Sequence, residues 1–267
     1  MPATGDKLRF RFAKTGTLRL LSHHDLMRCL ERMLRRASLP FKSTAGFHPS
    51  PRIVLAQSLS LGVLGREEVL EIEFLQPLDA DSTLATLREQ SPLGLDFTSV
   101  RVVPMKATAV PRRIVYRIEL PPERVAATAS RCADFLAQNK LWVNRMKPNP
   151  KQLNIRPYLR GMTVDPLPDA SGLLTRDLWV TQTGTARVDE LLKLLDVADL
   201  LDAGAIAERA VLEIRDEFTN TDAADVPPDG PADTLPLDPA TIAELTRKEE
   251  ELAAASWAIS PAGPVVE

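Results

Sequence analysis

Cysteine is scarce in this chain of 267 residues, which holds only Cys29 and Cys132. The two lie far apart and form no CxxC pair, so the chain lacks the ligands of a zinc ribbon or a cysteine-bound iron–sulfur cluster. Both occur in segments with helical periodicity, which favours buried thiols that act as small apolar side chains. We therefore expect neither a metal nor a cofactor.

Long apolar runs are absent as well. No stretch of about eighteen apolar residues occurs, and residues 1–6 (MPATGD) hold no apolar segment of a secretion signal. The tight loop at Thr15 and Gly16 matches no Walker or dinucleotide-binding pattern. We expect a cytoplasmic protein with reduced thiols and no contact with a membrane.

Histidine is scarce too, and its three residues, His23, His24 and His48, all fall in one strongly basic block. Residues 1–60 hold eleven Lys and Arg residues against three Asp and Glu residues, a net charge of +8. The net charge of −3 for the whole chain hides this asymmetry. Because imidazole changes its charge near neutral pH, we expect chemistry or pH-sensitive contacts in this block.

Bulky apolar residues are few at the other end of the chain. Residues 222–267 carry ten Asp and Glu residues against two Lys and Arg residues, a net charge of −8, with seven prolines and many alanines. Such a segment buries too little apolar surface to offset the entropy lost on ordering. We predict a mostly disordered acidic tail over 221–267, with one short helix over 239–255 capped by Asp238.

The first half of the chain alternates between strand and helix patterns. Residues 7–13 alternate apolar and basic side chains, which predicts a strand with one face solvated or bound to something anionic. Ser22 and Asp25 give a capping-box-like start to a helix with an apolar inner face and outward arginines. Further strands are predicted at 53–61, 69–74 and 95–103, with a turn at 62–68 and a helix at 78–90.

The same order returns in the second half. Strands are predicted at 113–120, 141–146, 152–163, 173–181 and 211–216, and helices at 122–139, 186–195 and within 196–208. The order βαββαβ is the ferredoxin-like pattern. We therefore predict an α+β fold of two ferredoxin-like units in tandem, at 1–106 and 112–220, with a linker at 104–111 and the disordered acidic tail at 221–267.

A second basic zone covers residues 140–164. No acid occurs between Asp134 and Asp165, and two aromatic residues, Trp142 and Tyr158, are interleaved with the cations. The cations are Lys140, Arg145, Lys147, Lys151, Arg156 and Arg160. Bases stack on aromatic rings while Lys and Arg neutralise phosphates, so this composition suits RNA. The alternative is a solvated sheet edge whose charges prevent edge pairing.

The histidine block has two interpretations. In Ser22-His23-His24-Asp25 a carboxylate could orient the His23 imidazole for catalysis. However, residues at this spacing do not face each other on a helix, and Ser22 and Asp25 are explained more simply as caps. A metal site would need His48 to reach His23 and His24 across the fold, and we do not favour one.

The loop over residues 46–52 (GFHPSPR) is a more specific signal. Pro49 and Pro51 force an extended, stiff path, and Gly46 permits a turn with positive φ. A rigid loop that carries Phe47 and ends in Arg52 is typical of a recognition element. The alternative is a buried connection between helix and strand.

Several of these motifs resemble the radical SAM-linked protein family, also called domain of unknown function 2344. They are residues 12–16 (FAKTG), 22–25 (SHHD), 35–40 (RRASLP), 46–51 (GFHPSP), 61–63 (LGV) and 155–158 (IRPY). The resemblance covers residues 7–217 and leaves the tail outside. It departs at His24, where the family usually has an apolar residue, so His23 carries the motif. It implies a partner radical SAM protein with a cobalamin-binding-type domain, and a role in RNA or ribosome modification.

We therefore expect an accessory RNA-binding or substrate-presenting protein for a radical SAM enzyme, because the chain lacks the cysteines for that chemistry. One alternative is an endoribonuclease with His23 as general base, since the double ferredoxin-like pattern is similar to metal-independent CRISPR repeat-processing enzymes. Another is a protein–protein scaffold. The residues expected to bind are Lys14, Ser22, His23, Asp25, Gly46, Phe47, His48, Pro51, Arg52, Arg156 and Tyr158.

Overall fold

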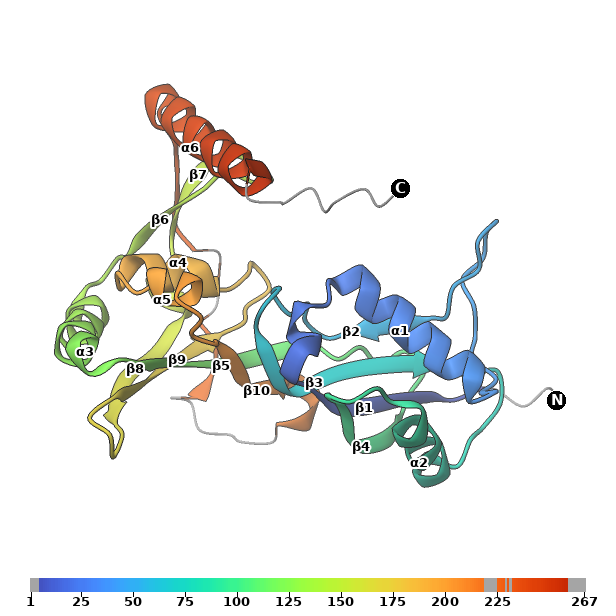
Figure 1. The fold of residues 1–267 in the computed structure, drawn as a ribbon. Helices are drawn as coiled ribbons and strands as arrows, with labels where there is room; N and C mark the ends of the chain where they lie inside the picture. The colour runs from blue at the N-terminus through green and yellow to red at the C-terminus, as the bar shows by residue number, and fades with distance from the viewer. Residues whose placement is uncertain (1–4, 219–224, 229, 231, 259–267) are drawn as a thin grey trace, which may run out of the picture.

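A computed structural model describes residues 5–218, 225–228, 230 and 232–258 of the chain. It is a mixed α+β fold built on a mostly antiparallel sheet. Figure 1 shows the two halves of the chain next to each other along this sheet, the N-terminal half in blue and green. None of the helices in the described ranges is long and apolar enough to span a bilayer.

The first half forms a sheet covered by helices. Its elements are β1 (Lys7–Lys14), η1 (Gly16–Leu20), α1 (His23–Arg36), β2 (Ile53–Leu55), β3 (Leu64–Glu73), α2 (Ala80–Gln90) and β4 (Leu95–Val103). The strands lie in the order β4-β1-β3-β2, and all neighbours are antiparallel. Because side chains alternate along β1, Leu8, Phe10 and Phe12 share one face and one buried core with Leu30 of α1 and Leu87 of α2.

The second half repeats this arrangement with a hairpin added. Its elements are β5 (Pro111–Leu120), α3 (Pro122–Ala137), β6 (Trp142–Arg145), β7 (Lys151–Asn154), η2 (Arg156–Tyr158), β8 (Leu159–Pro166), β9 (Gly172–Trp179), α4 (Val188–Leu194), α5 (Asp199–Asp202), β10 (Glu208–Ile214) and η3 (Arg215–Glu217). The strands lie in the order β10-β5-β9-β8, all antiparallel. The hairpin of β6 and β7 lies outside this sheet.

A short parallel pairing joins the two halves into one sheet. Glu208 and Arg209 of β10 pair with Leu64 and Gly65 of β3. Arg209 is fully buried there and forms an ion pair with Glu68 on β3. A Cβ at Gly65 would lie 2.5 Å from Cγ of Glu68, so the glycine leaves room for this buried carboxylate.

The tail contributes a strand and a helix. The strand β11 (Thr234–Pro236) pairs with β7, a contact that the sequence did not predict. The helix α6 (Pro239–Ala258) confirms the predicted helix, and Asp238 caps it by accepting a hydrogen bond from the Thr241 amide at 2.9 Å. Residues 221–224, 229, 231 and 259–267 of the predicted disordered segment lie outside the described residues.

The sequence predicted the helices well but misplaced three strand boundaries. The strand expected at 53–61 is formed only over Ile53–Leu55, and the turn expected at 62–68 lies largely within β3. The strand expected at 152–163 is divided into β7 and β8 by η2. The physical reason in the first case is that β2 and β10 share one edge of β3, so β2 ends before the residues that pair with β10.

Candidate functional site

The start of α1 is organised by its caps. Ser22 Oγ accepts a hydrogen bond from the Asp25 amide at 3.2 Å and donates one to Asp25 Oδ2 at 2.7 Å. His23 and His24 are exposed, and their ring centroids lie 5.7 Å apart. Because the Asp25 carboxylate accepts from Ser22, these contacts explain both residues as caps.

The outward face of α1 carries a row of cations. Arg28 lies 3.7 Å from Asp25 and Arg35 lies 2.7 Å from Glu31, both as exposed pairs within the helix. Arg36 donates to the side chain and backbone of Gln90. Arg32 is exposed and has no hydrogen-bond or ion-pair partner among the described residues. This face therefore has positive charge in excess of its carboxylates.

Residues 42–52 form an arm that projects beside α1, as Figure 1 shows. The Thr44 amide donates to the Ser50 carbonyl at 2.8 Å, and Ser43 bridges to Pro51, so the two sides of the arm pair like a short hairpin. Gly46 has φ of 138°, which an L side chain rarely adopts. Phe47, next to it, is 102% exposed.

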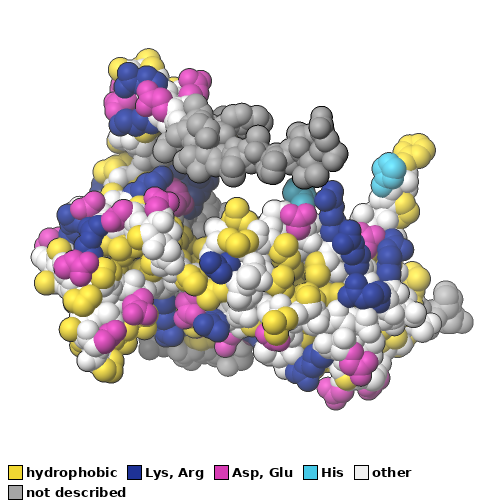
Figure 2. Space-filling view, in the orientation of Figure 1, with side chains coloured by type: hydrophobic (Ala, Val, Ile, Leu, Met, Phe, Trp, Pro, Cys, Tyr) yellow, Lys and Arg dark blue, Asp and Glu magenta, His cyan; other side chains and the backbone are white. Residues whose placement is uncertain are grey.

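The arm is anchored at its base. Arg52 and Lys42 each place a nitrogen 3.3 Å from Glu73 on β3. The Arg35 guanidinium lies 5.4 Å from the ring of Phe41, which connects the end of α1 to the arm. We call the exposed side of α1 together with residues 42–52 the α1–arm surface. Figure 2 shows Lys and Arg side chains in a row across it, with histidine at the start of α1 and on the arm.

Lys14 lies beneath this surface. It is 2% exposed, and its Nζ donates to the Leu21 carbonyl at 3.0 Å. Burial lowers the pKa of Lys14, although the charge of Glu68 opposes this shift. A hollow of about 10 Å³ separates Lys14 from His23, which is room for no more than one water. Lys14 therefore supports the start of α1 from below and presents no open surface.

Three of the six cations in the second basic zone are paired with carboxylates of the same chain. Arg145 pairs with Glu190 at 2.6 Å, Arg160 with Asp177 at 2.6 Å, and Lys140 with Asp233 at 2.9 Å. None of these carboxylates belongs to the zone, so the local sequence gave no sign of them.

The two residues of this zone that were expected to bind are also occupied. Arg156 donates to the backbone carbonyls of Leu136, Gln138 and Leu159, and Tyr158 is 1% exposed. Both residues belong to the second half of the chain and make their contacts within it, so neither is part of the α1–arm surface.

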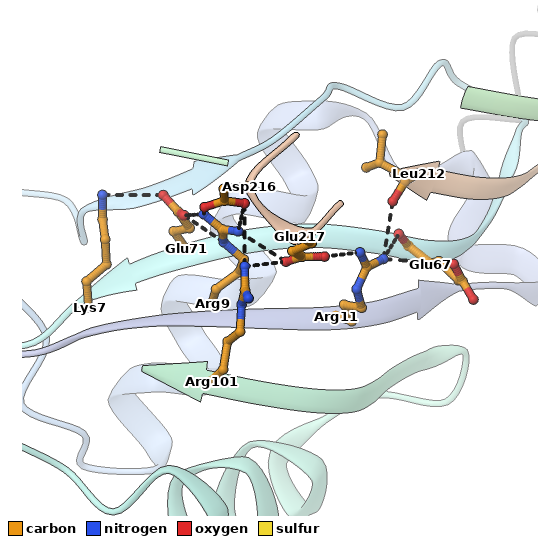
Figure 3. Close-up of polar contacts among 9 residues, drawn as sticks. All are labelled: Lys7, Arg9, Arg11, Glu67, Glu71, Arg101, Leu212, Asp216 and Glu217. Atoms are coloured by element: carbon orange, nitrogen blue, oxygen red, sulfur yellow. Dashed lines mark hydrogen bonds and ion pairs between the residues drawn. The ribbon is translucent and has the colours of Figure 1, made fainter. Parts of the chain in front are cut away.

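The charged face of β1 is bound to acids of the same chain. Arg9 is fully buried between Glu71, Asp216 and Glu217, with nitrogen–oxygen distances of 2.8, 2.6 and 3.1 Å (Figure 3). Arg11 also pairs with Glu217. The sequence predicted a face solvated or bound to something anionic, and the anion is the segment that follows β10.

Sequence reasoning placed the histidines and the arm together but left the arginines of α1 out of the site. Arg28 and Arg32 were predicted to point outward, and this is confirmed. The spacing of these arginines in the sequence was a signal for including them in the site, because it places them on one face of the helix, where they can bind an anion. Within the described residues, no three His, Cys, Asp or Glu side chains are arranged to hold a metal ion.

Comparison with known proteins shows which family the chain resembles. The family model described as "Uncharacterized protein conserved in bacteria (DUF2344)" matches residues 7–188. No curated protein matches the chain. A solved structure described as "Crystal structure of putative glycine cleavage system transcriptional repressor" covers 79% of this chain and 97% of that chain, at 12% identity and a TM-score of 0.23. A score this low carries no argument.

Proposed function

The chain belongs to the uncharacterized bacterial family of domain of unknown function 2344, and we propose that it is an RNA-binding accessory protein that contacts RNA through the α1–arm surface. The observation that carries this proposal is Phe47, which is 102% exposed on a projecting arm beside a row of arginines. No side chain of the described residues covers this ring, so both of its faces are accessible to a ligand. Unpaired bases stack on such rings while neighbouring cations neutralise phosphates.

The charge of the surface supports the same partner. Six cations lie on α1 and the arm, and three carboxylates pair with them: Asp25, Glu31 and Glu73. The exposed pairs among them contribute little on their own and exchange readily with phosphate. Arg32 can bind a phosphate without first releasing a carboxylate, because it has no ion-pair partner among the described residues.

The tandem ferredoxin-like arrangement is part of this proposal. The strand orders β4-β1-β3-β2 and β10-β5-β9-β8 support it, because each half then has the order 4-1-3-2 when its own four strands are numbered along the chain. In the first half the charged open face of the sheet is occupied by Asp216 and Glu217, which leaves the helix side and the arm as the available surface.

The partner enzyme is proposed from the family resemblance. A radical SAM protein with a cobalamin-binding-type domain would carry out the reaction, and this chain would present the RNA to it. An endoribonuclease with His23 as general base has less support, because the Asp25 carboxylate accepts a hydrogen bond from Ser22.

The test is a binding titration of the full chain with a fluorescent single-stranded RNA at several salt concentrations. We expect Phe47→Ala to weaken binding about tenfold, since stacking contributes about 1–3 kcal/mol per base. Arg28→Ala with Arg32→Ala should also reduce the slope of log affinity against log salt by about 1.4.

Arg247→Ala is the matched control, because it removes an exposed arginine that pairs within α6. It should leave RNA affinity unchanged. A Phe47→Ala protein that binds RNA as tightly as the unaltered chain would contradict the proposal. An RNA cleavage assay with His23→Ala tests the endoribonuclease alternative in the same samples.

A further inference from the structure

A cavity of about 540 Å³ lies in the second half of the chain, away from the α1–arm surface. Its walls come from the start of β5, the turn after β9 and the segment after β10, together with residues 225–228 and 230 of the tail. This volume is within the range of small-molecule sites, which is about 300–1,000 Å³. The cavity would admit a single nucleotide.

One wall of the cavity contains a buried arginine with unused hydrogen-bonding capacity. Arg112 is 4% exposed, and its guanidinium carbon lies 3.5 Å from the centroid of Phe218 and 5.3 Å from that of Trp179. Its Nη2 contacts Asp225, while Nη1 lies 3.5 Å from Glu213 and makes no hydrogen bond among the described residues. Buried polar groups are normally hydrogen-bonded, but this nitrogen is itself buried against Glu213, so it reaches the cavity only when the guanidinium turns.

A second arginine lines the same cavity. The side chain of Arg215 is exposed and has no hydrogen-bond or ion-pair partner in the described ranges. Among the described lining residues Asp225 is the one acid, and it is shared, since it also pairs with Arg160 at 2.9 Å. Two arginines of this described lining therefore face one shared carboxylate.

The remaining groups suit a flat polar ligand. Phe218 supplies an aromatic ring, one face of which lies against the Arg112 guanidinium. Thr181 and Thr183 supply hydroxyl groups that lie 3.0 Å from each other, next to the Tyr158 hydroxyl. Such groups hydrogen-bond the edge of a base or the hydroxyls of a sugar.

We propose that this cavity binds a mononucleotide, with its phosphate held by Arg215, and by Arg112 once its guanidinium turns toward the ligand, and with its base packed against Phe218. Guanidinium groups match phosphate geometry and form charge-assisted hydrogen bonds, and they also stack on aromatic faces. The site is separate from the α1–arm surface and does not depend on it.

The experiment is calorimetric titration of the full chain with AMP, with adenosine and inorganic phosphate as the two partial ligands. We expect one saturable site for AMP and at least tenfold weaker binding of each partial ligand. Arg215→Ala should weaken AMP binding about tenfold or more without changing the melting temperature, because the side chain is exposed and unpaired. Arg112→Lys, which keeps the charge and loses the planar fork, should weaken it too.

Arg32→Ala is the matched control, since it removes an equally unpaired arginine from α1. It should weaken RNA binding and leave AMP binding unchanged, whereas Arg215→Ala should do the reverse. No saturable AMP binding, or equal losses in Arg215→Ala and Arg32→Ala, would overturn the cavity site. The RNA titration would then still decide the proposed function separately.

Discussion

The buried pair of Glu68 and Arg209 provides a strict test of how the two halves are held together. Glu68 is 2% exposed and Arg209 is fully buried, and Nε of Arg209 donates to Oε1 of Glu68 at 2.7 Å. Glu68→Gln leaves the guanidinium in the core without its carboxylate. Breaking a buried ion pair by removing one partner costs about 3–5 kcal/mol, and we expect a loss of this size in the free energy of unfolding.

Replacing both partners should cost less than replacing one. In the double variant Glu68→Leu with Arg209→Met no guanidinium remains without its carboxylate, and the buried Lys14 loses the opposing effects of both charges together. Such replacements of whole pairs are often neutral or stabilising. Here the carbonyls of Gln57 and Ser58 also lose the donors that Arg209 supplies at 3.0 and 3.2 Å. Ser58 is exposed and Gln57 is half-buried, so water can replace these donors and the loss is smaller than the cost of about 1–3 kcal/mol for a fully buried group. The double variant should therefore be less stable than the unaltered chain but more stable than Glu68→Gln.

Urea unfolding followed by circular dichroism measures these differences. The control is Glu208→Gln, because Glu208 pairs with Arg66 across the same two strands but at the surface, at 2.8 Å. Exposed pairs contribute about 0–1 kcal/mol. If Glu68→Gln destabilises the protein no more than Glu208→Gln does, the buried pair does not hold β3 and β10 together and our reasoning is wrong.

Three further predictions concern the cap, the open face of the sheet and the tail. Ser22→Ala should lower the free energy of unfolding by about 1 kcal/mol through loss of the cap; an unchanged urea midpoint would exclude this role. A hydrogen bond from Arg9 is the chief cause that lowers the pKa of Asp216 from its ordinary 3.8. Burial raises the pKa of Glu217, but hydrogen bonds from Arg11 and Arg9 outweigh this effect and lower it from its ordinary 4.5. The stability that both carboxylates contribute is therefore present above these ordinary values and is lost as pH falls through the lowered ones. Asp216→Asn with Glu217→Gln should therefore flatten the acid side of a stability–pH curve, and a curve as steep as that of the unaltered chain would contradict it. Deleting residues 222–267 should tighten RNA binding in a low-salt titration, because the tethered tail carries a net charge of −8 that competes with RNA for the cations; equal affinity would count against such competition.

Local signals were sufficient for most helices and for the start of the candidate site. Ser22 and Asp25 predict the start of α1 because a cap depends only on neighbouring residues. Pro122 predicts the start of α3 for the same reason, since proline suits the first turn. The sequence also predicted a rigid loop that carries Phe47, because two prolines restrict the backbone whatever surrounds them; its exposure came from the structure.

The partners of charged residues were decided by the tertiary structure. Arg9 pairs with Asp216 across 207 positions of the chain, and Arg209 pairs with Glu68 across 141. No local pattern encodes such a pairing, because only the meeting of β10 with β3 brings the side chains together. For the same reason the sequence could not distinguish the free cation Arg32 from Arg145, which the fold pairs with Glu190. The sequence by itself determined where the charges and the rigid loop lie along the chain, and the packing of the two halves determined which of those charges remain available for a ligand.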